Sequence, residues 1–264
     1  MMLDKKNFYI DGKWITPIEP RSYKVIDPSK EEPCAEISLG GKKDIDKAVS
    51  AAKKAIKTWA FTKKEERLEL LEKLYVIYKK RWVEMAKLIS LEMGAPIDFS
   101  TKMQTAAGAS HIKSFKTILK DFKFEKDLGD ENNNQKLLYE PKGVCALITP
   151  WNWPINQVNL KVIPALASAC TVVLKPSEIA PLSSMLLAEM IDEAKFPTGV
   201  FNLVNGDGTV TGDALTSHPD IDMISFTGST RAGALISQNA AKDFKRISLE
   251  LGGKGANIIF KDAD

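Results

Sequence analysis

Short apolar runs alternate with helical stretches in the part of the chain that follows residue 143. The apolar runs are rich in β-branched side chains, which is typical of buried strands. The expected strands are 144–149, 171–174, 201–204, 222–227 and 246–250. Helices with a period near 3.6 residues are expected at 157–169, 182–194, 209–217 and 232–241. This alternation predicts an α/β fold with an open, mostly parallel sheet and helices on both faces.

The N-terminal region predicts a β-hairpin followed by helices. Two short apolar runs, 8–10 and 13–15, flank Asp11-Gly12, which suits a type I′ turn because both turn residues need positive φ. A helix with a clear apolar period follows, and Asp44 is its expected N-cap.

Two further helices are expected before residue 120. Thr62 and Glu65 have the spacing of a capping box, which predicts the start of a long amphipathic helix. Gly94 is suited to end that helix, with Pro96 just beyond it. A third helical stretch is expected over about 99–119.

Residues 121–142 predict a second hairpin. Phe122 and Phe124 alternate with lysine, a polar run covers 130–135, and residues 137–139 are apolar. We expect two strands joined by a long polar turn that protrudes from the body. A plain surface loop is the alternative.

Composition and charge are those of a globular chain. The 264 residues are 44% hydrophobic and 27% charged, which excludes a disordered chain. The 37 Lys and Arg against 34 Asp and Glu give a formal net charge of +3. Lysine pairs such as Lys53-Lys54 lie on helical patterns beside acidic residues, so they indicate solvated faces and no nucleic-acid partner.

Cysteine and histidine usage argues against a disulfide scaffold or a metal site. The three cysteines have no CxxC spacing, and His111 and His218 have no ligand in register. The first ten residues lack the apolar core of a signal peptide. The longest near-apolar run, 162–174, is shorter than the roughly 20 residues that span a bilayer. We therefore expect a cytoplasmic protein with no membrane partner.

Candidate chemistry gathers where the strands end, because ligands bind at the carboxyl ends of parallel strands. The first expected strand ends in TPWNWP at 149–154, a loop that two prolines stiffen. The side-chain amide of Asn152 would stabilise an oxyanion there. The alternative is a structural loop in which Asn152 caps the next helix.

The second strand is followed by Lys175 and Glu178 on one short turn. An ammonium that donates and a carboxylate that accepts suit a ribose diol, and Glu178 would repel a 2′-phosphate. The alternative is a helix start with Ser177 as its cap and Glu178 in its first turn.

The third and fourth strands lead into glycine-rich turns. Gly206, Gly208 and Gly212 depart from GxGxxG spacing and are a weak phosphate-loop signal, with a plain turn as the alternative. Gly228 and Ser229 precede a helix whose N-terminal N–H groups would bind a diphosphate. An ordinary N-cap is the competing interpretation.

The fifth strand carries Glu250 and leads into Gly252 and Gly253. A carboxylate in an apolar strand suits a general base, and the glycines would let a flat ligand approach. A paired structural carboxylate is the alternative.

Five segments with this chemistry follow one another in a fixed order: TPWNWP, KPSE, the turn at 206–212, FTGST at 226–230 and LELGGK at 249–254. Together they resemble the NAD(P)-dependent aldehyde dehydrogenase superfamily, in particular its non-phosphorylating, non-CoA-acylating branch. The N-terminal hairpin and helices are similar too, so the resemblance covers essentially the whole chain. It implies a Rossmann-like sheet.

The resemblance also implies residue roles. Asn152 would hold the oxyanion of a thiohemiacetal, and Glu250 would activate the water that hydrolyses a thioester. Lys175 and Glu178 would contact the adenosine ribose, and a glutamate there implies NAD rather than NADP. The cofactor-binding residues implied in this way are Thr149, Pro150, Trp151, Asn152, Lys175, Ser177, Glu178, Gly208, Gly212, Phe226, Thr227, Gly228, Ser229, Leu251 and Gly252.

The same resemblance divides the chain into four parts. Residues 1–120 would be the hairpin and helices of the cofactor domain, and 121–142 a protruding arm through which the protein forms a homodimer or homotetramer. Residues 143–251 would be the NAD-binding core, and 252–264 the start of a catalytic domain.

The family's nucleophilic cysteine has no match in these 264 residues. Members are about twice this length, and their cysteine lies beyond the glutamate that matches Glu250. Cys34, Cys145 and Cys170 are interpreted as structural. We therefore expect the N-terminal half of an enzyme that oxidises an aldehyde to a carboxylic acid, inactive by itself.

Two other functions compete with this one. The first is a non-catalytic NAD-binding or assembly module. The second is a CoA-acylating or semialdehyde-type relative. Glu250 argues against CoA acylation, because a water-activating base would hydrolyse the acyl thioester.

Overall fold

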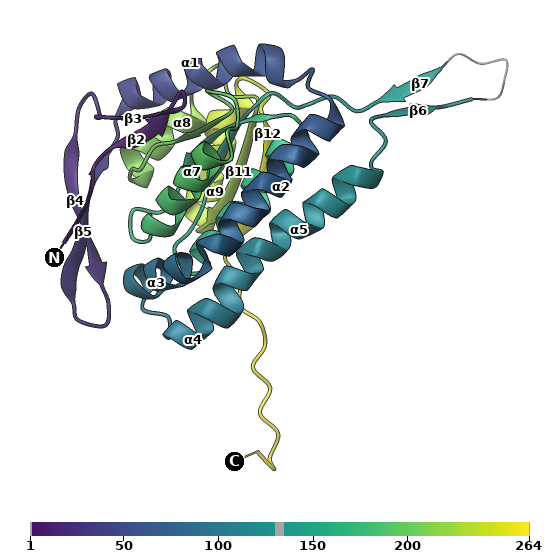
Figure 1. Cartoon of the computed structure of the whole chain (residues 1–264). Helices are drawn as coiled ribbons and strands as arrows, with labels where there is room; N and C mark the ends of the chain where they lie inside the picture. The colour runs from purple at the N-terminus through teal and green to yellow at the C-terminus, as the bar shows by residue number, and fades with distance from the viewer. Residues whose placement is uncertain (1, 130–134, 264) are drawn as a thin grey trace.

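A seven-stranded sheet forms the centre of the computed structural model, which describes residues 2–129 and 135–263 (Figure 1). Its strands are β2 (Phe8–Ile10), β3 (Lys13–Ile15), β8 (Val144–Ile148), β9 (Thr171–Lys175), β10 (Phe201–Leu203), β11 (Met223–Gly228) and β12 (Arg246–Leu251), in the order β12-β11-β8-β9-β10-β2-β3. Strands β8 to β12 are parallel, whereas β2 and β3 pair antiparallel. Each of the five strands expected after residue 143 is present, with ends within one residue of the prediction.

Helices cover both faces of this sheet, which confirms the predicted α/β fold. One face packs against α1 (Lys42–Trp59), α8 (Asp213–Thr216) and α9 (Thr230–Ala241). The other packs against α6 (Pro154–Ala167) and α7 (Leu182–Glu193), with α2 (Lys64–Lys80), α3 (Trp82–Met93) and α5 (Thr105–Asp121) outside them. The central strands β8 and β9 are buried along their whole length, because helices lie above and below them.

The order of the strands reverses beside β8. From β8 the chain builds β9 and β10 on one side, then crosses to build β11 and β12 on the other. In open parallel sheets this reversal opens a crevice at the carboxyl ends of the strands. The ends of β8 and β11 are therefore the place to look for a ligand site.

The N-terminal hairpin has the predicted turn. Asp11 and Gly12 have φ values of 53° and 72°, as a type I′ turn requires. The backbone N–H of Asp11 donates to Asn202 Oδ1 at 3.0 Å, which ties the hairpin to β10.

A second, three-stranded sheet was not predicted. It contains β1 (Leu3–Lys5), β4 (Arg21–Asp27) and β5 (Glu32–Leu39), in the order β1-β5-β4. Charged residues and Pro33 interrupt the apolar alternation of these strands, so their sequence lacks the usual strand signal.

The predicted N-cap of α1 is wrong. Gly41 is the N-cap, and Asp44 is the third helical residue. The buried Asp44 carboxylate accepts from the N–H groups of Gly41 at 3.1 Å and Ile18 at 2.9 Å. A carboxylate in the first turn can accept a hydrogen bond from the N–H of the cap residue. The acidic residue therefore marks the first turn, and the predicted N-cap lies three residues after the observed one.

The predicted capping box of α2 is displaced by one residue. Lys63 is the N-cap, and its N–H donates to the Glu66 carboxylate at 3.1 Å. The Thr62 hydroxyl instead donates to the carbonyl of Trp59 at 2.7 Å, so Thr62 and Glu65 do not form the box.

The single long helix predicted up to Gly94 is also wrong, because Arg81 interrupts it between α2 and α3. Arg81 has φ −96° and ψ 18°, and its guanidinium bonds to Glu84 at 2.8 Å and to Glu189 of α7 at 2.6 Å. Gly94 ends α3 with φ 75°, as predicted. The third helical stretch consists of α4 (Ile97–Phe99), the π-helical turn η1 (Ser100–Gln104) and α5.

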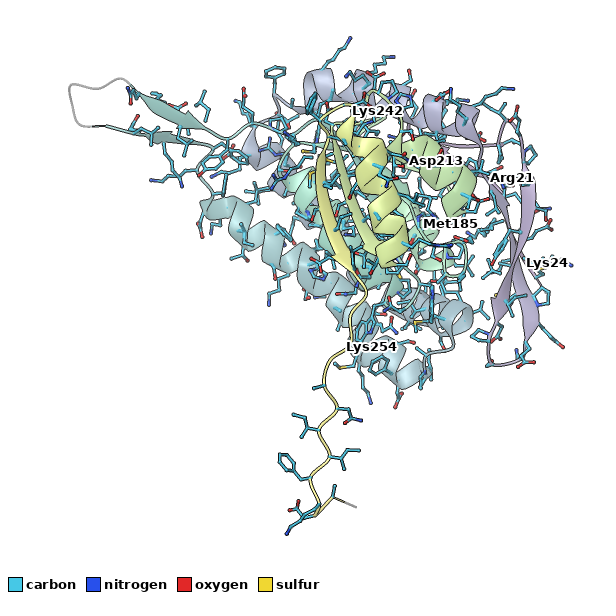
Figure 2. All side chains as sticks on the ribbon, turned by 180° about the vertical axis from the view of Figure 1, so that it is seen from behind. Arg21, Lys24, Met185, Asp213, Lys242 and Lys254 are labelled. Atoms are coloured by element: carbon cyan, nitrogen blue, oxygen red, sulfur yellow. The ribbon has the colours of Figure 1, made fainter. Side chains whose placement is uncertain are left out.

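Two segments extend away from the body (Figure 1). Strands β6 (Glu125–Asp127) and β7 (Lys136–Leu138) form the expected exposed hairpin, and its polar turn at 130–134 lies outside the described residues. The segment after β12, which includes Lys254, is extended and exposed (Figure 2). No helix in the described part of the chain is long and apolar enough to cross a membrane.

Candidate functional site

A cavity of about 330 Å³ lies where β8, β9 and β11 end, against α8 and α9. Figure 2 shows these two helices side by side, with Asp213 on α8. The residues that line the cavity are Ile148, Lys175, Gly208, Thr209, Gly212, Asp213, Thr216, Phe226, Arg231, Ala232, Leu235, Ile236 and Asn239. Apolar walls with a few polar groups at the rim suit a flat heterocycle.

Lys175 is a buried cation beside this cavity. Its Nζ donates to the carbonyl oxygens of Gly206 at 2.7 Å and Pro176 at 2.9 Å, and lies 3.8 Å from Glu178 Oε2. Burial lowers the pKa of Lys175, and the nearby Glu178 and Asp207 carboxylates oppose this. The structure therefore brings together the ammonium and the carboxylate that the sequence places on one turn.

Ser177 does not cap a helix. Its hydroxyl accepts from the N–H of Ile179 at 3.3 Å, and α7 begins only at Leu182. The alternative in which Ser177 and Glu178 start a helix is therefore wrong, and the turn that carries Glu178 is a separate segment.

The glycine-rich turn folds as a π-helical segment, η2 (Gly208–Gly212). Its N-cap Asp207 accepts from the N–H of Val210 at 2.7 Å and pairs with Arg21 at 2.6 Å. Burial alone would raise the pKa of Asp207, but these partners lower it. A Cβ at Gly206 would collide with Thr211, whereas a Cβ at Gly208 would have no atom within 4 Å. The turn therefore requires a glycine at position 206, because a side chain there would collide with Thr211. Gly208 leaves space beside the cavity.

Ser229 is the N-cap of α9, and its hydroxyl accepts from the N–H of Ala232 at 3.2 Å. The side chain therefore has the ordinary capping role. The first turn of α9 also contributes Arg231 and Ala232 to the cavity, so this helix N-terminus borders it. Both interpretations of the segment are compatible with this geometry.

A second cavity of about 610 Å³ holds the two candidate catalytic residues. Asn152, in the loop after β8, and Glu250, in β12, both line it. The other lining residues are Pro150, Trp151, Gln157, Leu160, Thr227, Gly228, Leu251 and Gly252. Thr149 is buried at the end of β8, and its hydroxyl has no hydrogen-bond partner among the described residues.

Asn152 is exposed and makes no hydrogen bond to any residue of the described ranges. The N-cap of α6 is Trp153, with no side-chain bond, so the alternative in which Asn152 caps that helix is wrong. Its amide is free to donate to a ligand.

Glu250 is exposed rather than buried, which corrects the expectation of an apolar environment. Among the described strands β12 pairs only with β11, so its outer edge is open. Glu250 borders two cavities at once, the second being a space of about 390 Å³ on the α6 side of the sheet.

Several residues at these cavities were not found from sequence. Lys161 on α6 is buried, and its Nζ donates to Ser225 Oγ at 2.8 Å. Burial lowers its pKa to about 8, although Glu250 opposes the shift. Arg231 and Asn239 line the first cavity from α9. Lysine and arginine on helices are usually solvated, so only the packing of α6 and α9 reveals these positions.

The strand order and the crevice define an α/β dinucleotide-binding domain. The chain belongs to the aldehyde dehydrogenase family, which matches residues 14–264. The 3-succinoylsemialdehyde-pyridine dehydrogenase of a Pseudomonas species is 51% identical over 264 residues, which are 100% of this chain and 54% of that protein.

Solved structures agree with this assignment. An aldehyde dehydrogenase from Bartonella henselae is 60% identical with a TM-score of 0.95, over 100% of this chain and 55% of that one. A mutant of aldehyde dehydrogenase C from Pseudomonas syringae, in complex with NAD⁺ and octanal, is 47% identical with a TM-score of 0.93, over 98% and 53% of the two chains. The chain thus spans about half the length of these relatives.

Proposed function

We propose that these 264 residues bind the cofactor and supply two catalytic groups in the NAD-dependent oxidation of an aldehyde to a carboxylic acid. The observation that carries this proposal is the shared cavity of Asn152 and Glu250, an unpaired amide and an exposed carboxylate beside the carboxyl ends of the sheet. NAD⁺ would accept a hydride there.

Asn152 and Glu250 would act on different steps. The Asn152 amide would donate to the oxyanion formed when a cysteine thiolate adds to the aldehyde, which is worth about 3–4 kcal/mol for one such donor. Glu250 would take a proton from the water that releases the acid from its thioester. Both groups are accessible from the one cavity, so the roles require no rearrangement of β12.

The residues present fit NAD. Gly208 leaves open space at the cavity of about 330 Å³, where an adenine would lie, and the Lys175–Glu178 turn offers a donor and an acceptor for a ribose. We assign the diphosphate to Gly228 and Ser229, and the path between the two cavities to Thr149, Pro150, Trp151, Phe226 and Thr227. Ser177, Gly212, Leu251 and Gly252 complete the proposed set. The NAD⁺ complex of the Pseudomonas syringae relative supports NAD binding, and Glu178 would disfavour the 2′-phosphate of NADP.

We infer that the thiolate comes from outside the described residues. Cys34, Cys145 and Cys170 do not line the cavity of Asn152 and Glu250. We therefore propose that the 264-residue chain by itself binds NAD⁺ but does not oxidise aldehydes. Turnover that is lost on mutating Cys145 or Cys170 would contradict this.

The nature of the aldehyde and of the assembly is also proposed. The 51% identical relative is named for a semialdehyde, which favours a semialdehyde-type substrate over a CoA-acylating function. We propose that the 121–142 arm joins copies of the protein into a dimer or tetramer, and that the protein works in the cytoplasm. The division into 1–120, 121–142, 143–251 and 252–264 remains our proposal for its domains.

Isothermal titration calorimetry with NAD⁺ and NADP⁺ tests the cofactor assignment. Saturable binding that favours NAD⁺ is expected, and Glu178→Ala should weaken NAD⁺ about tenfold while it narrows the gap to NADP⁺. Glu193→Ala, an exposed glutamate at the end of α7, is the matched control. A chain that melts cooperatively but binds neither nucleotide would refute the assignment.

A further inference from the structure

Two of the three cysteines share a cavity that differs from the one shared by Asn152 and Glu250, although Glu250 borders both. Cys145 lies in β8, and Cys170 immediately precedes the neighbouring strand β9. Both are buried, and both line the space of about 390 Å³ bounded by α6, β11 and β12. Small solutes can enter that space, because it is also lined by the exposed residues Glu140, Ser248 and Glu250.

The surroundings of Cys170 favour a thiolate. The backbone N–H of Lys142 donates to its Sγ at 3.3 Å. The Ser168 hydroxyl oxygen lies 3.6 Å from the same sulfur, and its one proton has nearer acceptors in the carbonyl oxygens of Pro164 at 2.8 Å and Ala165 at 3.1 Å. Cys145 follows Val144 and Cys170 precedes Thr171, and these two neighbours are paired in the β8–β9 ladder, so both thiols line the same space from adjacent segments. Hydrogen bonds to sulfur stabilise its anionic form, as in other reactive cysteines.

The pKa values of the two thiols shift in opposite directions. The neighbouring Cys145 thiol is the largest cause that lowers the pKa of Cys170, to about 6, and backbone groups add to it against the effect of burial. The neighbouring Cys170, burial and Asp222 raise the pKa of Cys145. Lys161, with its Nζ bonded to Ser225, is a further positive group at the cavity.

Cys34 provides the contrast within the same chain. It lies in β5, where its Sγ donates to the carbonyl of Val25 at 3.4 Å. Burial and the nearby Asp27 carboxylate raise its pKa. Cys34 is more exposed than the other two cysteines but is the poorer nucleophile by these contacts.

We propose that Cys170 and Cys145 form a peroxide-sensitive thiol pair, in which Cys170 is the site of oxidation and Cys145 resolves it. The Cys170 thiolate attacks one oxygen of a hydroperoxide, the O–O bond breaks, and Cys170 becomes a sulfenic acid while the leaving oxygen takes up a proton. The Cys145 sulfur then attacks the Cys170 sulfur, an S–S bond forms, and hydroxide leaves with the Cys145 proton as water. Two electrons from the thiols thus reduce one peroxide. This pair does not depend on the aldehyde dehydrogenase function.

The test uses the reduced 264-residue chain, treated with a slight excess of hydrogen peroxide at pH 7 and then with iodoacetamide. Intact mass should fall by about 2 Da before alkylation, and peptide mapping should join residues 145 and 170 while Cys34 carries the alkyl group. Cys34→Ser is the matched control and should behave as wild type. In Cys145→Ser, which removes the resolving sulfur but keeps a polar group beside Cys170, the sulfenic acid should persist and react with dimedone at position 170, whereas Cys170→Ala should give no dimedone adduct.

Three results would overturn the proposal. The first is oxidation of Cys34 at the same rate as Cys170. The thiolate at Cys170 predicts that Cys170 is oxidised at least ten times faster than Cys34. The second is oxygen addition to wild type without a cross-link, and the third is dimedone labelling of Cys145 rather than Cys170. If a variant does not fold, the peptide map of the wild-type chain still tests the proposal, since it shows whether residues 145 and 170 are joined and whether Cys34 is alkylated.

Discussion

The ammonium nitrogen of Lys175 lies 3.8 Å from Glu178 Oε2, although the Lys175 side chain is 5% exposed and that of Glu178 is 27% exposed. Two backbone carbonyls already accept from Lys175, so the lysine is fixed in place without the carboxylate. Glu178 consequently keeps acceptor capacity for a ligand hydroxyl. The arrangement differs from a surface ion pair, in which both side chains would be solvated and worth little.

Replacement of Lys175 tests the role of the buried charge in binding. Lys175→Met should lower NAD⁺ affinity by about 10- to 100-fold, because hydrogen bonds to charged groups contribute about 1.5–3 kcal/mol. Calorimetric titration measures this, and circular dichroism should show an intact fold. Unchanged affinity in a folded variant would place the ribose elsewhere.

Space at Gly208 gives a steric test of the cavity. A Cβ there would meet no atom of the protein within 4 Å, so we expect Gly208→Leu to leave the melting temperature nearly unchanged. It should nevertheless weaken NAD⁺ binding by at least tenfold, since the leucine would project beside the 330 Å³ cavity. Gly255→Leu is the matched control, because that glycine is equally open but lies in the exposed C-terminal segment. Equal binding by both variants would argue against adenosine in this cavity.

Glu92 predicts a pH-dependent stability. It ends α3 as a buried residue, and its carboxylate accepts from the N–H groups of Leu182 and, at 3.1 Å, Ser183 at the start of α7. Burial raises its pKa from 4.5 to about 7, against the effect of these bonds. The folded state therefore holds the Glu92 proton more tightly than the unfolded state, and its contribution to stability falls as pH rises from about 4.5 to about 7.

Glu92→Gln mimics the protonated acid, so the variant should not lose stability as pH rises from about 4.5 to about 7. Relative to wild type, the variant should gain up to about 3 kcal/mol in unfolding free energy between pH 5 and pH 8. Urea denaturation at both pH values measures the difference. Glu65→Gln, at an exposed position, should show no such pH dependence. If Glu92→Gln were instead less stable than wild type at pH 8, the raised pKa assigned to Glu92 would be wrong.

The apolar side chains of the 121–142 arm predict association. Leu138 is 58% exposed at the end of β7, beside other exposed apolar residues of the hairpin. Leu138→Asp should shift the chain from dimer or tetramer toward monomer in light scattering after size-exclusion chromatography. Val83→Asp, a 61% exposed position on α3, is the matched control. An unchanged mass for Leu138→Asp would remove the arm from the interface.

The core of the fold could be predicted because its strands are buried on both faces. Val144–Ile148 and Thr171–Lys175 are apolar almost throughout, so their sequence states their environment. The strands β4 and β5 could not be found in this way, since each has a polar face and depends on pairing with the other. Helix starts at Gly41 and Lys63 were misplaced because several polar residues near each start could serve as caps.

The candidate site was predictable only where the residues lie at, or shortly after, the carboxyl end of a strand. Lys175 and Glu250 lie at the ends of β9 and β12, and Asn152 lies four residues after β8, so the sheet topology brings them to one edge. The exposure of Glu250 depends on what lies along the outer edge of β12, which the local sequence does not encode. Likewise, the positions of Lys161 and Arg231 follow from how helices pack on the sheet, and a single sequence does not reveal that packing.

The N-terminal hairpin completes the sheet at its β10 edge, through residues 191 positions apart such as Asp11 and Asn202. During synthesis β2 and β3 leave the ribosome long before β10. The hairpin therefore has no β10 to pair with while the helices of the first 120 residues form. Closing so long a loop makes this edge a slow, late step of folding. Mutations in the hairpin should therefore change mainly the unfolding rate. Mutations in the central strands β8 and β9 should change mainly the folding rate.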